Sequence, residues 1–320
     1  MGPKLAFLAF AVALAAVGGS VYFGLMRHHG SSGGGGALPL AARAAPVRSS
    51  ATDSSPLLRR PHTPRVRMSG HEAIPLHFAK PPHAALLFDV DTGTVLGSYK
   101  PFKRLPIASL TKIMTALLVT ERAGPNERVM ITRDALHYGG TGIGLLPRGK
   151  RIRLETLLNG LLIVSGNDTA IALADHVSGS QRAFVAQMNR RARQLGLRCT
   201  HYVSPDGLEP QNVSCPRDLA VLTRLAMRNR RITRIVRRRG VSLPFPVKGG
   251  RLVLFGHNPL IRDLHYPGAI GLKTGFIDAS GHTYVGVARR HGHTYGVVLL
   301  NTPNAGKQAA GLLNMAFRRR

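Results

Sequence analysis

Short apolar runs bounded by turn residues occur early and late in the region from residue 84 to the C-terminus. The runs Ala84–Val90 and Thr94–Tyr99 flank the turn-forming sequence Asp91-Thr92-Gly93, and this arrangement predicts a β-hairpin. Three later runs have the same character and predict further strands: Ala269–Phe276, Thr283–Ala288 and Thr294–Asn301.

Between these strands the apolar residues recur at helical spacing. Ala108–Ala123 follows Pro106, carries Leu110 and Met114 at helical spacing, and ends before Gly124, so it predicts a helix. Other segments also predict helices: Thr156–Val164, Thr169–Val177, Gln181–Leu195, Pro216–Met227 and the terminal Gln308–Phe317. The order predicts an α/β fold in which an antiparallel sheet is flanked by helices and an all-helical lobe is inserted.

The N-terminal segment has a different composition. Leu5–Met26 is an uncharged stretch of 22 residues, which as a helix would be about 33 Å long and would span a bilayer core. Residues 1–27 therefore predict a membrane anchor or a cleavable signal peptide, and both alternatives stay open. Residues 28–70, which include Ser31–Gly36, predict a flexible linker. Residues 71–320 remain as one folded domain.

Charge narrows the range of partners. The chain has 44 Lys and Arg against 15 Asp and Glu, a formal net charge of +29. Such a field favours an anionic partner such as nucleic acid, an acidic membrane surface or an anionic polymer, although arginines scattered over a solvated surface are an equal alternative. Trp is absent and no nucleic-acid-binding motif occurs, so we expect no nucleic-acid partner. Arg224, Arg228, Arg231 and Arg238 are expected to line one solvated helical side.

Cysteine and histidine offer little metal chemistry. Cys199 and Cys215 lie 16 residues apart, and in an exported protein we expect them to form a disulfide rather than remain two buried thiols. The histidines have no metal-ligand spacing with carboxylates, so we expect no metal.

Candidate chemistry begins with the sequence Ser-Leu-Thr-Lys at the start of the first predicted helix. Ser109 and Lys112 are three residues apart, so their side chains lie on one face. A serine needs a base to become a nucleophile, and a lysine serves when burial and a nearby cation lower its pKa. Alone, this pattern also occurs on many exposed helices.

Two further motifs lie at junctions between predicted elements. In Ser165-Gly166-Asn167 the serine can relay a proton and the asparagine can hold an amide, although an ordinary helix-capping turn has the same sequence. In Lys273-Thr274-Gly275 a cation and a hydroxyl can bind a carboxylate, and the next amide, of Phe276, can stabilise an oxyanion. A polar edge strand is the alternative for the third motif.

Together the three motifs, separated by 56 and 108 residues, resemble the signature of penicillin-recognising serine enzymes. Their surroundings are most similar to the low-molecular-mass D-alanyl-D-alanine carboxypeptidases. The similar stretches are Pro106–Thr115, Leu157–Ala170, Ser204–Leu208 and Tyr266–Gly275. The resemblance covers about Ala84 to Phe317 and implies a β-lactamase/transpeptidase-like fold.

The resemblance also implies a role for each matched residue. Ser109 would attack the bond between two terminal D-alanines of a peptidoglycan stem peptide, with Lys112 as base and Ser165 as proton relay. The substrate would be held by Asn167, Lys273, Thr274, Gly275 and Phe276. It implies no metal or other cofactor, and it implies β-lactam antibiotics as inhibitors.

Two positions depart from the family pattern. Ile277 stands where a threonine is frequent, and Thr302–Ala310 contains no arginine that could bind a second carboxylate, with Lys307 as the substitute. Three alternatives remain: a D,D-endopeptidase, a serine β-lactamase, and a catalytically weak wall-binding protein. A class A β-lactamase needs a glutamate after the second motif, whereas Glu155 precedes it.

Overall fold

The computed structural model describes residues 64–68, 74–246 and 250–319. The predicted membrane segment Leu5–Met26 and most of the predicted linker 28–70 lie outside this range. Within it, no helix combines the length and apolar character needed to cross a membrane. Val66, inside the predicted linker, is buried in the core, and Arg67 pairs with Thr94.

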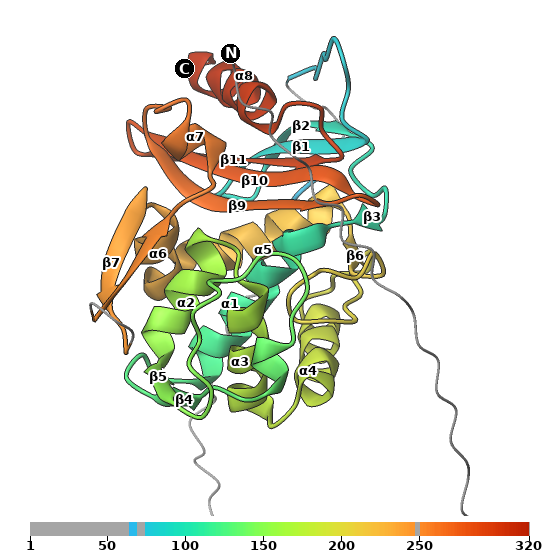
Figure 1. Cartoon of the computed structure of the whole chain (residues 1–320). Helices are drawn as coiled ribbons and strands as arrows, with labels where there is room; N and C mark the ends of the chain where they lie inside the picture. Colours follow the sequence, from blue (N-terminus) through green and yellow to red (C-terminus); the bar gives the residue numbers. More distant parts are fainter. Residues whose placement is uncertain (1–63, 69–73, 247–249, 320) are drawn as a thin grey trace, which may run out of the picture. The chain divides into compact units, whose positions relative to one another are not determined.

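A five-stranded antiparallel sheet forms one layer of the fold, with the order β2-β1-β11-β10-β9 (Figure 1). Its strands are β1 Ala84–Asp89, β2 Val95–Tyr99, β9 Ala269–Ile277, β10 Gly281–Arg290 and β11 His293–Leu300. The strands predicted from the sequence are therefore confirmed. Neighbouring strands of the sheet are consecutive in sequence, except that β1 pairs with the last strand, β11.

Both faces of the sheet are covered, which explains why the central strands are apolar throughout. Along β1, Leu86 and Phe88 join the core shared with the helical region, whereas Ala85 and Leu87 join a second core beneath the terminal helix. This terminal helix, α8, spans Ala305–Arg318 and lies above the sheet in Figure 1. Alternate residues of one strand thus stabilise two separate layers.

The helical region packs against the opposite face of the sheet (Figure 1). Its helices are α1 Lys112–Arg122, α2 Leu154–Ile163, α3 Asn167–Ser178, α4 Gln181–Gln194, α5 Pro216–Arg228 and α6 Arg230–Val236. The predicted inserted lobe is confirmed, although the sequence pattern did not predict its helix α6. One boundary is wrong: Ala108–Thr111 is a 3₁₀ turn, η1, because Ala108 has a φ of 48° that no regular α-helix accommodates.

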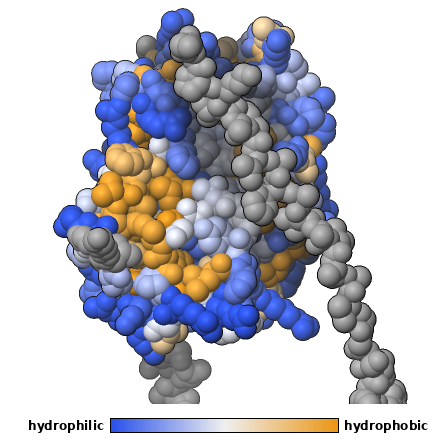
Figure 2. Space-filling view, viewed as in Figure 1, coloured by the Kyte–Doolittle hydropathy of each residue, from blue (hydrophilic) through white to orange (hydrophobic). Residues whose placement is uncertain are grey.

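Short elements connect these layers, and the sequence patterns did not predict them. They are β3 Leu105–Pro106, β4 Arg128–Met130, η2 Asp134–Leu136, β5 Arg151–Arg153, β6 Val213–Ser214, β7 Gly240–Pro244, β8 Arg251–Phe255 and α7 Pro259–Arg262. The β7–β8 hairpin exposes Val253 and Phe255, and Figure 2 shows an apolar area of surface on that side of the molecule.

A disulfide joins Cys199 to Cys215, with the two Cα atoms 5.6 Å apart. This confirms the expected bridge. Closing a loop of this length stabilises the fold by about 3 kcal/mol in the loop-entropy model. Because β6 begins at Val213 and pairs with β3, the bridge also fixes the segment that leads into η1.

The four arginines expected on one solvated helical side do not share one environment. Arg224 is buried, Arg231 forms an ion pair with Glu155, and Arg238 donates to Asn159. The expectation fails because the chain turns at Asn229, between α5 and α6, so no continuous helix carries all four.

Candidate active site

Ser109 and Lys112 meet at the junction of η1 and α1. The Nζ atom of Lys112 lies 3.0 Å from the Oγ atom of Ser109. Lys112 is completely buried, and Ser109 lines an open cleft. The structure therefore places a buried amine directly behind a hydroxyl that a substrate can reach.

Two further oxygen atoms hold the Lys112 amine. Nζ donates to Asn167 Oδ1 at 2.6 Å and to the backbone carbonyl of Asp206 at 2.6 Å. Both atoms can only accept hydrogen bonds. When Lys112 is neutral, its two N–H groups are used by these acceptors, and its lone pair remains for the Ser109 hydroxyl.

The loop that supplies the Asp206 carbonyl is itself fixed. The Oγ atom of Ser204 donates to Asp206 Oδ1 at 2.7 Å, and Thr115 Oγ1 donates to the carbonyl of Pro205 at 2.6 Å. Ser204–Leu208 is one of the stretches that resemble the family, but the sequence analysis assigned it no role. The turn-forming sequence Ser-Pro-Asp-Gly could have indicated one, because the side chains of such a turn form hydrogen bonds that fix the direction of a backbone carbonyl.

Gly207 lets this loop approach the nucleophile. Its φ is 85°, and a Cβ atom built there would lie 2.1 Å from the carbonyl oxygen of Ala108. A side chain at this position would push the loop away from η1. The glycine is therefore required by both backbone conformation and space.

Burial lowers the pKa of Lys112 from 10.5 to about 8. Nearby carboxylates act in the opposite direction, those of Asp206, Asp168 and Glu209. Burial is the largest cause at Lys112. Burial and the positive charge of Lys112 both lower the pKa of Lys273, and this repulsion between the two neighbouring amines is mutual.

The second motif faces the first from the start of α3. Ser165 has a φ of 63°, is 9% exposed and lines the cleft. The Asn167 side chain does not cap a helix: its Oδ1 accepts from Lys112 and its Nδ2 donates to the carbonyl of Gly139 at 2.7 Å. Asn167 therefore connects the lysine to the loop that precedes β5.

The third motif lies on β9, at the edge of the main sheet. Thr274, Gly275 and Phe276 line the cleft, and Lys273 is buried beside it, where its Nζ donates to the carbonyl of Thr274 at 2.9 Å. A Cβ atom at Gly275 would lie 2.9 Å from the Ser109 amide nitrogen, so the missing side chain brings β9 against η1.

A hydrogen bond to β10 strengthens this contact. Thr283 Oγ1 donates to the carbonyl of Ile107 at 3.0 Å, from the position paired with Gly275. The start of η1 is thereby attached to the sheet. The backbone amides of Ser109 and Phe276 consequently belong to segments that are held at a fixed separation.

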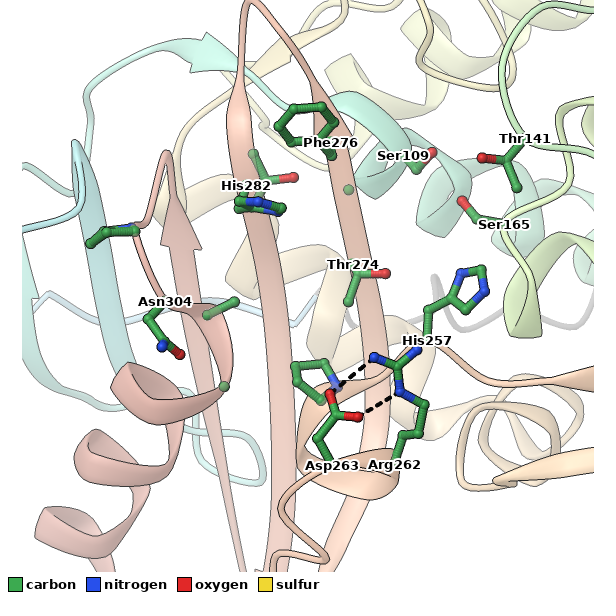
Figure 3. A pocket seen from close by; sticks show the side chains of 16 residues that line it. Ser109, Thr141, Ser165, His257, Arg262, Asp263, Thr274, Phe276, His282 and Asn304 are labelled. Carbon is green, nitrogen blue, oxygen red and sulfur yellow. Dashed lines mark hydrogen bonds and ion pairs between the residues drawn. The ribbon is translucent and has the colours of Figure 1, made fainter. Parts of the chain in front are cut away.

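The cleft has a volume of about 500 Å³. In Figure 3 the hydroxyl groups of Ser109, Thr141 and Ser165 point toward one another on one side of the cleft, and Thr274 lies on β9 across from Ser165. The sequence analysis did not identify Thr141, which belongs to none of the three motifs. Its backbone carbonyl accepts a hydrogen bond from the backbone N–H of Asn167 at 2.7 Å, so the second motif holds Thr141 in place.

Comparison with known proteins agrees with this geometry. Residues 77–304 match the family model described as D-alanyl-D-alanine carboxypeptidase. The chain belongs to that family. It is 34% identical over 246 residues to D-alanyl-D-alanine carboxypeptidase DacB2 of Mycobacterium tuberculosis, covering 74% of this chain and 82% of that protein.

A further relative and a solved structure match over a similar length. A D-alanyl-D-alanine endopeptidase of Haemophilus influenzae is 33% identical over 226 residues, covering 69% of this chain and 75% of the relative. The crystal structure of a D-alanyl-D-alanine carboxypeptidase of Mycobacterium tuberculosis superposes with a TM-score of 0.71 at 31% identity, covering 77% and 94% of the two chains. The expected carboxypeptidase family and its fold are thus confirmed.

The far side of the cleft differs from what the family pattern suggested. Lys307 does not line it; the neighbouring residues of α8 do. An arginine does line it, but from α7: Arg262 forms two hydrogen bonds with Asp263, at 2.6 and 3.1 Å (Figure 3). His257 lies in the same part of the cleft, and burial together with the Lys273 and Arg262 charges lowers its pKa.

Metal ligation has little support in the described part of the chain. Within these residues, the one cluster of potential ligands is Cys199, Cys215 and Asp218. Both sulfur atoms belong to the disulfide and have no thiolate to offer.

Proposed function

We propose that this carboxypeptidase removes the terminal D-alanine from peptidoglycan stem pentapeptides through an acyl-enzyme on Ser109. The observation that carries the proposal is the 3.0 Å contact between Lys112 Nζ and Ser109 Oγ inside a site that excludes water from the amine. A buried amine with a lowered pKa is a competent general base near neutral pH.

Acylation would proceed by addition and then elimination. Neutral Lys112 takes the hydroxyl proton of Ser109 while Oγ bonds to the carbonyl carbon between the two D-alanines, which gives a tetrahedral oxyanion. When the oxyanion collapses, the C–N bond breaks, and Ser165 donates its hydroxyl proton to the departing amine and receives the Lys112 proton in its place, so that Lys112 is neutral again. Ser165 is suited to this role because it lines the cleft beside Ser109 (Figure 3).

Substrate binding and charge stabilisation would come from β9. The backbone amides of Ser109 and Phe276 donate to the oxyanion, which is supported by the close approach of Gly275 to η1. Lys273 and Thr274 bind the terminal carboxylate, and Asn167 holds the substrate amide as well as Lys112. Water then hydrolyses the ester, and a β-lactam would acylate Ser109 by the same route.

Two alternative activities differ in their support. An endopeptidase uses the same groups, and a relative of that name matches this chain. A class A β-lactamase needs a glutamate that activates water, but Glu155 is bound by Arg231 at 2.9 Å at the opposite end of α2 from Ser165. That position favours slow rather than fast hydrolysis of a penicilloyl adduct.

The location of the enzyme also belongs to the proposal. Leu5–Met26 would direct the chain out of the cytoplasm as an anchor or signal peptide, residues 28–70 would act mainly as a tether, and the domain from residue 71 would work in the cell envelope. The disulfide between Cys199 and Cys215 supports an oxidising compartment.

The test uses the full chain with fluorescent penicillin and with a defined stem pentapeptide. We expect one adduct per molecule on Ser109, its loss in Ser109→Ala, and release of D-alanine from the pentapeptide. A cross-linked muropeptide measures the endopeptidase alternative in parallel. An adduct on another residue, or D-alanine release that survives Ser109→Ala, would contradict the proposal.

A further inference from the structure

A second cavity, of about 600 Å³, lies between α5, α6 and the start of β9. It shares no lining residue with the substrate cleft. In Figure 1, α5 and α6 lie directly below the sheet, so this cavity is formed where the helical region meets the sheet. The proposed reaction at Ser109 uses none of its residues.

Positive charge dominates this cavity. Its charged lining residues are Asp91 and four arginines: Arg224, Arg228, Arg237 and Arg289. The side chains of Arg228, Arg237 and Arg289 are exposed and make no hydrogen bond or ion pair with the described part of the chain. Three guanidinium groups therefore face a common space without acceptors among the described residues.

The fourth arginine forms the fixed wall of the cavity. Arg224 is only 4% exposed, and its Nε, Nη1 and Nη2 atoms each donate to one backbone carbonyl. The acceptors are Val90, Arg65 and Asp91, with Nε at 2.8 Å from Val90 and Nη2 at 2.6 Å from Asp91. A guanidinium has five N–H groups, so two remain without a described acceptor.

The chain is built closely around this guanidinium. Gly93 has a φ of 84°, and a Cβ atom there would lie 2.3 Å from Arg224 Nη1. Arg67 donates its backbone N–H to the carbonyl of Gly93 at 2.8 Å, which closes the segment over the turn. Arg224 is thus a positioned group rather than a mobile surface side chain.

Four guanidinium groups around one space match a particular ligand chemistry. Guanidinium forks bind phosphate oxygens through paired hydrogen bonds, and the net charge of the lining exceeds what one carboxylate neutralises. The volume leaves room for an organic group attached to the phosphate. We propose that this cavity binds a phosphate ester, either a phosphodiester of an anionic wall polymer or the headgroup of an acidic phospholipid.

The test measures binding by the full chain in a non-ionic detergent, using isothermal titration calorimetry. The probes are a poly(glycerol phosphate) oligomer, a short-chain phosphatidylglycerol and inorganic phosphate. We compare the pocket variant Arg228→Gln, Arg237→Gln, Arg289→Gln with the control Arg182→Gln, Arg190→Gln, Arg193→Gln. The control removes the same charge from exposed arginines of α4.

We expect at least one phosphate ester to bind, with Kd raised at least tenfold in the pocket variant and less than twofold in the control. Whether the oligomer or the phospholipid binds more tightly identifies the source of the ester. An equal loss in both variants, equal competition by polyglutamate, or binding of none of the probes would overturn the proposal.

Folding is monitored independently of binding. The penicillin adduct should form at the same rate in all variants, because none of the substituted residues lines the substrate cleft. If the triple variant loses that adduct, Arg237→Gln with Arg289→Gln replaces it, and a Kd change below twofold in that pair would equally refute the site.

Discussion

Two buried cations make different use of the same kind of environment. Lys112 beside the substrate cleft is fully buried, and Arg224 beside the second cavity is 4% exposed. Each donates to backbone carbonyls that lie far away in sequence, Asp206 for the lysine and Val90 for the arginine. Each also depends on a neighbouring glycine with positive φ, Gly207 or Gly93 respectively.

The difference lies in whether the cation can lose its proton. An ammonium responds to burial by becoming neutral more easily, and the pKa of Lys112 falls to about 8. A guanidinium keeps its charge in proteins, so burial of Arg224 creates a permanent positive centre. Similar packing therefore favours the proposed base in one region and a permanently charged group in the other.

Exchanging the type of cation at position 112 should have the largest effect. We expect Lys112→Arg to lower the rate of Ser109 acylation by about 1,000-fold, because a guanidinium cannot accept the hydroxyl proton. Stopped-flow measurement with fluorescent penicillin gives the rate. A variant that retains more than a tenth of the acylation rate would show that Lys112 is not the base.

Removing the other cation should affect stability instead of chemistry. We expect Arg224→Leu to lower the free energy of unfolding by about 3 kcal/mol, because three carbonyls lose a charged donor. Arg228→Leu, an exposed neighbour on the same helix, should change it by less than about 0.5 kcal/mol. Urea denaturation measures both, and the acylation rate of the folded Arg224→Leu protein should stay within twofold of the original.

The pH dependence of acylation separates the two cations further. Since the pKa of Lys112 is lowered to about 8, the amine is mainly protonated below this pH and mainly neutral above it. The acylation rate should therefore rise close to tenfold per pH unit between pH 6 and 7.5 and level off above pH 8.5. Arg224→Leu should leave this profile unchanged, whereas a profile that is flat from pH 6 to 8 would exclude the amine as base.

The layers of the fold follow from the sequence because local patterns encode them. The Asp91-Thr92-Gly93 turn and the helical spacing after Pro106 both predicted elements that the structure contains. The pairing of β1 with β11 and the helix α6, which begins after the Asn229 cap, were not predictable in this way. Both depend on contacts between distant segments or on a single side-chain cap, which periodicity does not report.

The motif residues were identified because the three motifs together resemble the family signature, and their partners were missed. Ser109 and Lys112 are close in sequence, so helix geometry alone predicts their contact. The Asp206 carbonyl is a backbone group, and no residue type marks it as an acceptor. The cavity lined by arginines was likewise not predicted, because Arg224 and Arg289 come together only where α5 packs against the sheet.

The smallest effect that still distinguishes the two regions comes from their glycines. A Cβ atom at Gly207 would lie 2.1 Å from the Ala108 carbonyl oxygen, and one at Gly93 would lie 2.2 Å from that of Arg65. We expect both Gly207→Ala and Gly93→Ala to lower the free energy of unfolding by about 1 to 2 kcal/mol. Only Gly207→Ala should also slow acylation, by about tenfold, because it moves the carbonyl that holds Lys112.

Gly196→Ala is the matched control, since Gly196 has a φ of 68° but no atom within 4 Å of the added Cβ. The loss of unfolding free energy in this control measures the effect of the backbone conformation alone. The additional loss in Gly207→Ala and Gly93→Ala then measures the steric clash. Equal acylation rates in Gly207→Ala and Gly93→Ala would mean that the Asp206 carbonyl does not position the base. A slower rate in Gly207→Ala alone would show that acylation depends on the loop that holds Lys112. The turn that holds Arg224 would then affect stability and anion binding but not acylation.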